Sequence, residues 1–426
     1  MNKTRFERGT AGHIRLHVLP TNRFKTFAIS LYAGLPLQEQ TVTATALTPF
    51  VLRRGTESYP ETTQFREQLE HMYGAGFGFD VYKRGNYQMV QFRMDTINDS
   101  FVKSRESLLG QSFAFLGEVV TKPAKENGGF RTAYVNSERE SVRKKLEGII
   151  NDKIRYAAER CTEEMFKDDP YRLHPLGERS ELDGITPESL YASYQNWLQQ
   201  AHLDLYVVGD TTLAEVEELV AKHFSLSRST SPEYKPEQVK IRGGEVRTVK
   251  EALDVNQGKL NLGLRTPITY GDERYASLLL YNGILGSYPH SKLFINVREK
   301  ESLAYYAASR YDGHKGIVGI QSGIEIANYE KALRIIEAQL ASMRAGEISE
   351  LEMSQTKAMI RNSLLEMQDS AFEMIAYDFN RVLSGKDRPA EELLRQVEQV
   401  QPQDVVAAAE TVQLDTIYFL TGQKEG

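Results

Sequence analysis

The chain has 426 residues, with 41% hydrophobic and 26% charged residues, values typical of a soluble globular protein of two domains. The formal net charge of −6 gives no reason to expect binding to nucleic acid or to an anionic membrane. There is no apolar run of about 18 residues and no signal-peptide core, so we expect no membrane span. The single cysteine, Cys161, excludes an intramolecular disulfide and favours a cytoplasmic location.

The first predicted strand alternates, with Ile14, Leu16 and Val18 on one face. His13 and His17 are four residues apart and would share the other face of that strand. A zinc site also needs a third ligand and an open position, and the sequence contains neither H-x-x-E-H nor H-E-x-x-H. We therefore interpret both histidines as facing water or a neighbouring strand.

A long polar helix is predicted around residues 137–165, and a similar one around residues 349–383. The first begins with SERESV, which places Glu138 near its start. The simplest interpretation of Glu138 is a solvated helix residue that pairs with Arg139, Arg143 or Lys144 at helical spacing.

The two halves of the chain repeat a helix start. Thr186-Pro187 opens a helix that leads to the strand at residues 203–208, and Gln401-Pro402 opens one that leads to the strand at residues 416–420. Between the halves lies a segment rich in Ser, Pro, Glu and Lys. We predict an α+β protein with two tandem homologous domains, each a mainly antiparallel sheet with helices packed on one face. The predicted boundaries are 1–228 for the first domain, 229–244 for the linker and 245–426 for the second.

Residues 283–305 of the second half read GILGSYPHSKLFINVREKESLAY. Arg298 and Tyr305 carry good donors for carbonyl oxygens or for a developing oxyanion. The structural alternative is that Arg298 caps a helix C-terminus or pairs with Glu299 or Glu301, and that Tyr305 starts a buried strand. The segment is no phosphate-binding loop, and neither a G-x-S-x-G motif nor a base for Cys161 supports another catalytic route.

Residues 46–60 read ALTPFVLRRGTESYP, and this frame resembles H-x-x-E-H…K-G-T…Y-P of the insulinase/pitrilysin-type zinc peptidases, which include the mitochondrial-processing-peptidase-like proteins. The resemblance places the two zinc histidines on Ala46 and Phe50, the catalytic glutamate on Pro49 and the third zinc ligand on Glu138. Methyl, benzyl and pyrrolidine groups can neither bind zinc nor accept a proton from water. The resemblance therefore implies a peptidase homologue, closest to a bacterial non-catalytic group, with no metal, no other cofactor and no catalytic residue.

The resemblance also covers residues 283–305, where the family has a glycine-rich loop followed by S-x-L-F-x-x-(L/V)-R-E-x-x-x-L-A/G-Y. It implies that Arg298, Tyr305, Gly283 and Gly286 bind substrate, and that the chain is one half of a clam shell. The implied partner is an H-x-x-E-H-bearing homologous chain in a heterodimer, and the implied substrate is a peptide or unfolded polypeptide. A scaffold with no role in proteolysis is the alternative, and a homodimer also remains open.

Overall fold

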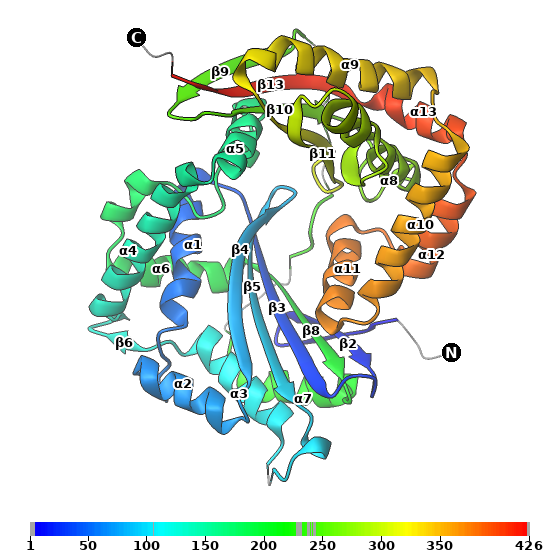
Figure 1. Ribbon diagram of the computed structural model, residues 1–426. Helices are drawn as coiled ribbons and strands as arrows, with labels where there is room; N and C mark the ends of the chain where they lie inside the picture. The colour runs from blue at the N-terminus through cyan, green and yellow to red at the C-terminus, as the bar shows by residue number, and fades with distance from the viewer. Residues whose placement is uncertain are drawn as a thin grey trace. The chain divides into compact units, whose positions relative to one another are not determined.

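The computed structural model describes residues 5–104, 106–226, 232–236, 239, 241 and 244–423. Its contacts divide the chain into two compact units. The first unit comprises the chain up to Glu147, Leu173–Tyr234 and Ser370–Phe379. The second comprises Gly148–Arg172, Lys235–Asp369 and the chain from Asn380 onward. Each unit is built around one sheet (Figure 1).

The sheet of the first unit has the strand order β1-β2-β8-β3-β5-β4. Its β2 and β8 run parallel, and its other neighbouring strands are antiparallel. The strands are β1 (Glu7–Ala11), β2 (Ile14–Pro20), β3 (Thr26–Pro36), β4 (Gly76–Arg84), β5 (Tyr87–Ile97) and β8 (His202–Gly209). A small ladder joins β6 (Lys125–Glu126) to β7 (Gly129–Phe130).

Helices cover one face of this sheet and enclose the apolar core of the first unit. They are α1 (Glu39–Leu52), α2 (Thr62–His71), α3 (Leu108–Thr121), α4 (Thr132–Gly148), α6 (Pro187–Gln200) and α7 (Leu213–His223). The core contains the predicted apolar face of β2, with Ile14, Leu16 and Val18 all fully buried. Strand alternation therefore places the polar side chains of β2 on the opposite face.

The sheet of the second unit has the order β11-β12-β10-β13-β9, in which only β13 and β9 pair in parallel among the described strands. The strands are β9 (Arg247–Leu253), β10 (Gly258–Arg265), β11 (Ala304–Asp312), β12 (Ile317–Ile324) and β13 (Gln413–Gly422). The helices are α5 (Lys153–Met165), α8 (Tyr275–Asn282), α9 (Tyr329–Ala345), α10 (Glu350–Met367), the end of α11 (Ala371–Ser384), α12 (Ala390–Gln399) and α13 (Pro402–Thr411). Two π-helical segments, Gly283–Ser287 and Phe294–Lys300, lie between α8 and β11.

The two sheets repeat one topology, because β2-β8-β3-β5-β4 and β9-β13-β10-β12-β11 have the same order and directions. The repeated helix starts occupy equivalent places, since α6 leads into β8 and α13 leads into β13, each with proline in its first turn. The predicted α+β class with mainly antiparallel sheets is confirmed. The proposed domain boundaries along the chain remain a prediction.

Each unit also contains a helical segment from the other half of the sequence. In the first unit, Ser370–Phe379 packs on the sheet face that carries Tyr32 and Tyr206. In the second unit, α5 packs against Tyr418 and Leu420 of β13. Phe419, whose side chain alternates with these two, contacts Tyr329 of α9 on the other face. Helical segments therefore cover both faces of the sheet in each unit.

Three expectations about local structure were wrong. The predicted helix around residues 137–165 is interrupted by Ile149–Asn151, and α5 starts anew because the side chain of Asp152 caps it at Arg155 N. The segment around residues 349–383 is likewise two helices, α10 and α11. His13 lies in the turn before β2 with φ 65°, so only His17 belongs to that strand. Part of the predicted linker lies outside the described residues, but its Tyr234 is buried.

Candidate functional site

The positions that the resemblance aligns with the zinc motif, here called the degenerate motif, lie on α1 in the first unit. Ala46, Pro49 and Phe50 are all buried. Pro49 is within the helix, three residues before its end, and its carbonyl accepts a hydrogen bond from Arg53 N. A proline this close to the helix end removes only one donor, so the last turn still forms. The three motif positions are therefore part of the packed core of the first unit.

An aromatic and cationic cluster surrounds Phe50. Its ring meets Phe79 of β4 edge-on, at 4.8 Å between centroids. The guanidinium of Arg53 lies 5.7 Å from the centre of Phe50 and 5.4 Å from that of Phe79. Arg54 lies 5.1 Å from the ring centre of Tyr134 on α4. These distances are within the range of cation–π attraction, so the rings position both arginines.

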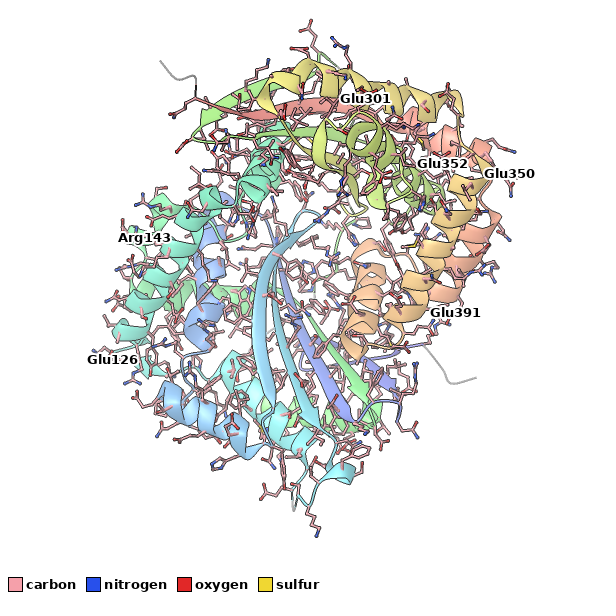
Figure 2. All side chains as sticks on the ribbon, viewed as in Figure 1. Glu126, Arg143, Glu301, Glu350, Glu352 and Glu391 are labelled. Carbon is pink, nitrogen blue, oxygen red and sulfur yellow. The ribbon has the colours of Figure 1, made fainter. Side chains whose placement is uncertain are left out.

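Glu138 is not the solvated residue that its helical spacing suggested. Its side chain is 2% exposed, and its ion pairs are with Arg54 at 3.1 Å and Arg53 at 3.5 Å. Two of the three predicted helical partners are engaged elsewhere: Arg139 donates to Ile185 O, and Arg143, labelled on α4 in Figure 2, pairs with Asp183. A buried carboxylate needs such partners because desolvation of an unpaired charge is costly.

The residues present at this site do not fit zinc. A tetrahedral site needs three protein ligands with nitrogen, sulfur or oxygen donors, and Glu138 is the one donor among the four positions that correspond to ligands or base. Within the described ranges there is also no group of three His, Cys, Asp or Glu side chains placed to hold a metal ion. The chemistry of this site is therefore that of an ion pair.

Arg298, the first of the two predicted substrate contacts, is exposed on the π-helical segment Phe294–Lys300. Its guanidinium lies 4.6 Å from the ring centre of Phe294. The predicted ion pair is not observed: Glu301, labelled in Figure 2, pairs with Lys331 at 2.8 Å, and Arg298 forms no ion pair with any described residue. Arg298 does lie in the last turn of its helical segment, as the structural alternative expected. The donors of Arg298 are available to a ligand.

Tyr305, the second predicted contact, projects from a bulge in β11. In the pairing with β12, Ala304 lies opposite Ile324 and Tyr306 opposite Gly323, which leaves Tyr305 without a partner residue. Its side chain is 64% exposed, so it does not start a buried strand. Bulges redirect a side chain relative to regular alternation. A hydrogen bond from Leu303 N to Val297 O joins this strand start to the segment that carries Arg298.

Gly283 and Gly286 are buried in the π-helical segment Gly283–Ser287. A Cβ atom on Gly283 would lie 2.4 Å from Thr356 Cγ2, and one on Gly286 would lie 2.5 Å from the backbone nitrogen of Ser309. Packing alone thus accounts for glycine at both positions, and a substrate contact by either one stays a prediction. Arg298 and Tyr305 lie in the second unit, whereas the degenerate motif lies in the first.

Sequence reasoning missed a buried polar network in the first unit. His17 Nε2 lies 2.8 Å from Asp204 Oδ1, and Arg15 binds the same carboxylate at 2.6 and 2.7 Å. Arg8 contacts His17 Nδ1. It also binds the carboxylate of Asp378, with N···O distances of 2.7 and 2.9 Å. Burial alone would raise the pKa of Asp204, but the hydrogen bonds from Arg15 and His17 lower it to about 2. An aspartate in the apolar run Leu203–Val208 was the available sequence signal.

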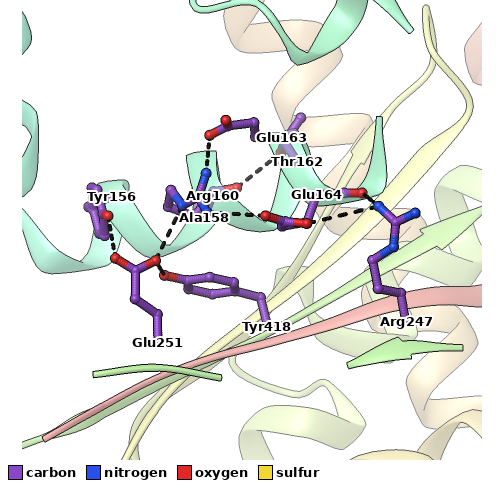
Figure 3. A network of polar contacts seen from close by, with 9 residues as sticks. All are labelled: Tyr156, Ala158, Arg160, Thr162, Glu163, Glu164, Arg247, Glu251 and Tyr418. Carbon is purple, nitrogen blue, oxygen red and sulfur yellow. Dashed lines mark hydrogen bonds and ion pairs between the residues drawn. The ribbon is translucent and has the colours of Figure 1, made fainter. Parts of the chain in front are cut away.

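A second network fixes α5 in the second unit (Figure 3). The carboxylate of Glu251 on β9 accepts hydrogen bonds from Tyr156 and Tyr418, each at 2.6 Å, and from Arg160 at 3.3 Å. Arg160 also pairs with Glu163 and Glu164. Burial opposes ionisation of Glu251, but these three donors lower its pKa. The network therefore joins α5 to β9 and β13.

Comparisons with known proteins agree with the absence of zinc ligands at Ala46 and Phe50. The family model described as the peptidase M16 inactive domain matches residues 184–360. A probable inactive metalloprotease, YmfF of Bacillus subtilis (strain 168), is 40% identical over 415 residues, which is 96% of each chain. No helix among the described residues is long and apolar enough to cross a membrane.

Solved structures show the same fold along the whole chain. A conserved protein from Enterococcus faecalis V583 is 31% identical, with a TM-score of 0.91 over 99% of this chain and 100% of that one. A peptidase M16 inactive domain from Pseudomonas fluorescens has a TM-score of 0.81 over 98% of each chain at 17% identity, which shows the fold alone. The resemblance noted in the sequence is confirmed: the chain belongs to the M16 peptidase family, as a homologue of its inactive members.

Proposed function

We propose that this chain is the substrate-binding, non-catalytic half of a two-chain zinc peptidase, and that Arg298 and Tyr305 contact the polypeptide. The observation that carries the proposal is the presentation of these two side chains. Both are exposed, Arg298 has no ion pair among the described residues, and Tyr305 sits on a bulge. Arg298 and Tyr305 are seven residues apart in the chain, and bulges that redirect a side chain are over-represented next to active sites.

The chemistry of this pair suits a peptide backbone. A guanidinium offers five N–H donors and a phenol offers one O–H donor, and peptide carbonyls are acceptors. Neither group supplies a nucleophile or a metal, so the partner chain would provide zinc and base through an intact H-x-x-E-H motif. In this proposal the two chains form a heterodimer, and the chain alone cleaves no peptide.

The test is reconstitution with an H-x-x-E-H-bearing homologue from the same genome, with turnover of a fluorogenic unstructured peptide as the readout. Arg298→Ala and Tyr305→Phe should each lower turnover about 10²- to 10³-fold if the donors stabilise charge that develops in the reaction. Complex formation, measured by size-exclusion chromatography, should be unchanged because both residues act on substrate.

Two matched controls lie on the same strand. Arg310→Ala removes an exposed guanidinium of β11, and Tyr306→Phe removes the phenol next to Tyr305, which is half-buried over Gly323. Both should leave turnover within about twofold. Normal complexes in which Arg298→Ala and Tyr305→Phe retain full turnover would contradict the proposal and favour a scaffold with no role in proteolysis.

A further inference from the structure

The carboxylate of Glu138 is divided between two arginines. Oε1 accepts a hydrogen bond from Arg54 Nη1 at 3.1 Å. Oε2 is buried, has no hydrogen-bond partner among the described residues and lies 3.5 Å from Arg53 Nη2. The two oxygens therefore have different environments: one is hydrogen-bonded, whereas the other faces only a positive charge.

We propose that Arg53 has taken the electrostatic place of the lost metal ion, so that its guanidinium, on a side chain that is 47% exposed, compensates the carboxylate that the family resemblance identifies as a zinc ligand. A buried carboxylate without compensation would be strongly destabilising. This explains how Glu138 can remain buried at a site that has no other metal ligand.

The surroundings of Arg53 keep its charge in this position. Arg53 is the C-cap of α1, where its backbone N–H bonds to Pro49 O and a positive side chain also complements the helix dipole. Its guanidinium lies near both Phe50 and Phe79, 5.7 and 5.4 Å from their ring centres. Phe50 stands where the resemblance places the second zinc histidine. Phe50, which stands in place of this ligand, therefore also packs against the guanidinium of Arg53.

A consequence is that the three lost residues alone would not restore zinc binding. Zinc beside Glu138 would meet the charge of Arg53 at close range, and like charges within about 4 Å repel strongly at a partly buried site. The inference concerns the first unit alone and does not depend on the proposed role of Arg298 and Tyr305.

The test compares zinc affinity in two engineered backgrounds. The first carries Ala46→His, Pro49→Glu and Phe50→His; the second adds Arg53→Ala. Competition against a chromogenic chelator should show zinc binding at least about tenfold tighter in the second background. Arg143→Ala, added in place of Arg53→Ala, is the matched control, because Arg143 lies on the same helix as Glu138 but pairs with Glu140 and Asp183. Equal zinc affinity with and without Arg53 would overturn the proposal.

A second measurement decides the matter if these backgrounds fail to fold. Arg53→Ala, Glu138→Gln and the double variant form a thermodynamic cycle in the native chain. Arg53→Ala should lower the melting temperature, and the double variant should melt about 2–4 °C above the sum of the single effects, since removing both charges leaves neither unpaired. Strictly additive effects would show that Arg53 does not compensate Glu138.

Discussion

The hydroxyl of Tyr206 on β8 donates a 2.9 Å hydrogen bond to Asp378 on α11, 172 residues further along the chain. The same carboxylate binds the guanidinium of Arg8, and the ring of the next residue, Phe379, stacks on Tyr32 with centroids 3.9 Å apart. Two adjacent residues of one helix thus attach a distant segment to the first sheet, one by polar contacts and the other by an aromatic contact.

Asp378→Asn should destabilise the protein by about 1–3 kcal/mol, because it removes one partner of a mostly buried ion pair. This loss of stability is smaller than for a fully buried ion pair, because Arg8 is 40% exposed and can reach water. Urea unfolding measures the change. Asp80→Asn is the control: its pair with Arg93 is exposed on both sides, so its removal should cost less than about 1 kcal/mol. Equal losses for the two variants would contradict the assignment.

Stability should fall as the pH drops below about 6.5, in part because of His17. Burial lowers the pKa of His17, and Arg8 adds to the effect, although Asp204 and Asp378 oppose it. Arg8 donates to Nδ1, so the neutral ring donates from Nε2 to Asp204. The unfolded chain therefore takes up this proton at a higher pH than the folded chain, and the contribution of neutral His17 is complete only above about pH 6.5.

The measurement is the melting temperature of the wild-type chain and of His17→Gln between pH 7.5 and 5. Glutamine can accept from Arg8 and donate to Asp204 without titrating. The variant should lose less stability on acidification than the wild type. Asp204 does not interfere in this range, since its folded pKa is about 2. Parallel pH profiles for the two proteins would exclude His17 as the titrating group.

Glu251→Gln should lower the free energy of unfolding by about 1–2 kcal/mol, because Glu251 accepts three hydrogen bonds that hold α5. Glu163→Gln is a matched control on α5 itself: Glu163 is half exposed and pairs with Arg160 (Figure 3). Its removal should cost less than about 0.5 kcal/mol. Chemical denaturation of both variants separates a structural anchor from a surface ion pair, and similar small losses would argue against the anchor.

The purified chain alone should contain no stoichiometric zinc and should cleave no peptide. Ala46, Pro49 and Phe50 cannot bind the metal or act as base, and a chelator should leave the melting temperature unchanged. Elemental analysis provides the measurement. Finding about one tightly held zinc per chain that is lost in Glu138→Gln would refute this expectation.

Gly286→Ala should destabilise the second unit by about 1–3 kcal/mol, because the new methyl group would collide with the backbone nitrogen of Ser309 at 2.5 Å. Gly319→Ala on β12 is the control, since a Cβ there has nothing within 4 Å and should be neutral or slightly stabilising. Thermal melts of both variants test the packing role. If Gly286→Ala were as stable as the wild type, packing would not explain this glycine.

Local patterns in the sequence predict much of this fold. Alternation in β2 and the proline starts of α6 and α13 identify elements that the structure contains, because these signals depend on a few neighbouring residues. Glu138 was misjudged because its partner Arg54 is 84 residues away, whereas helical spacing offers only nearby candidates. The packing of α5 and of Ser370–Phe379 likewise depends on long-range contacts that no local pattern records.

The position of Asp378 also determines the order in which the protein can be completed during translation. At about 5–20 residues per second, the 172 residues that separate Tyr206 from Asp378 require about 10–30 s. The first sheet is finished when β8 has emerged, but its second face, with Arg8, Tyr32 and Tyr206, stays uncovered for that time. Until α11 has been synthesised, the nascent chain therefore lacks the polar and aromatic contacts that Asp378 and Phe379 make with this face.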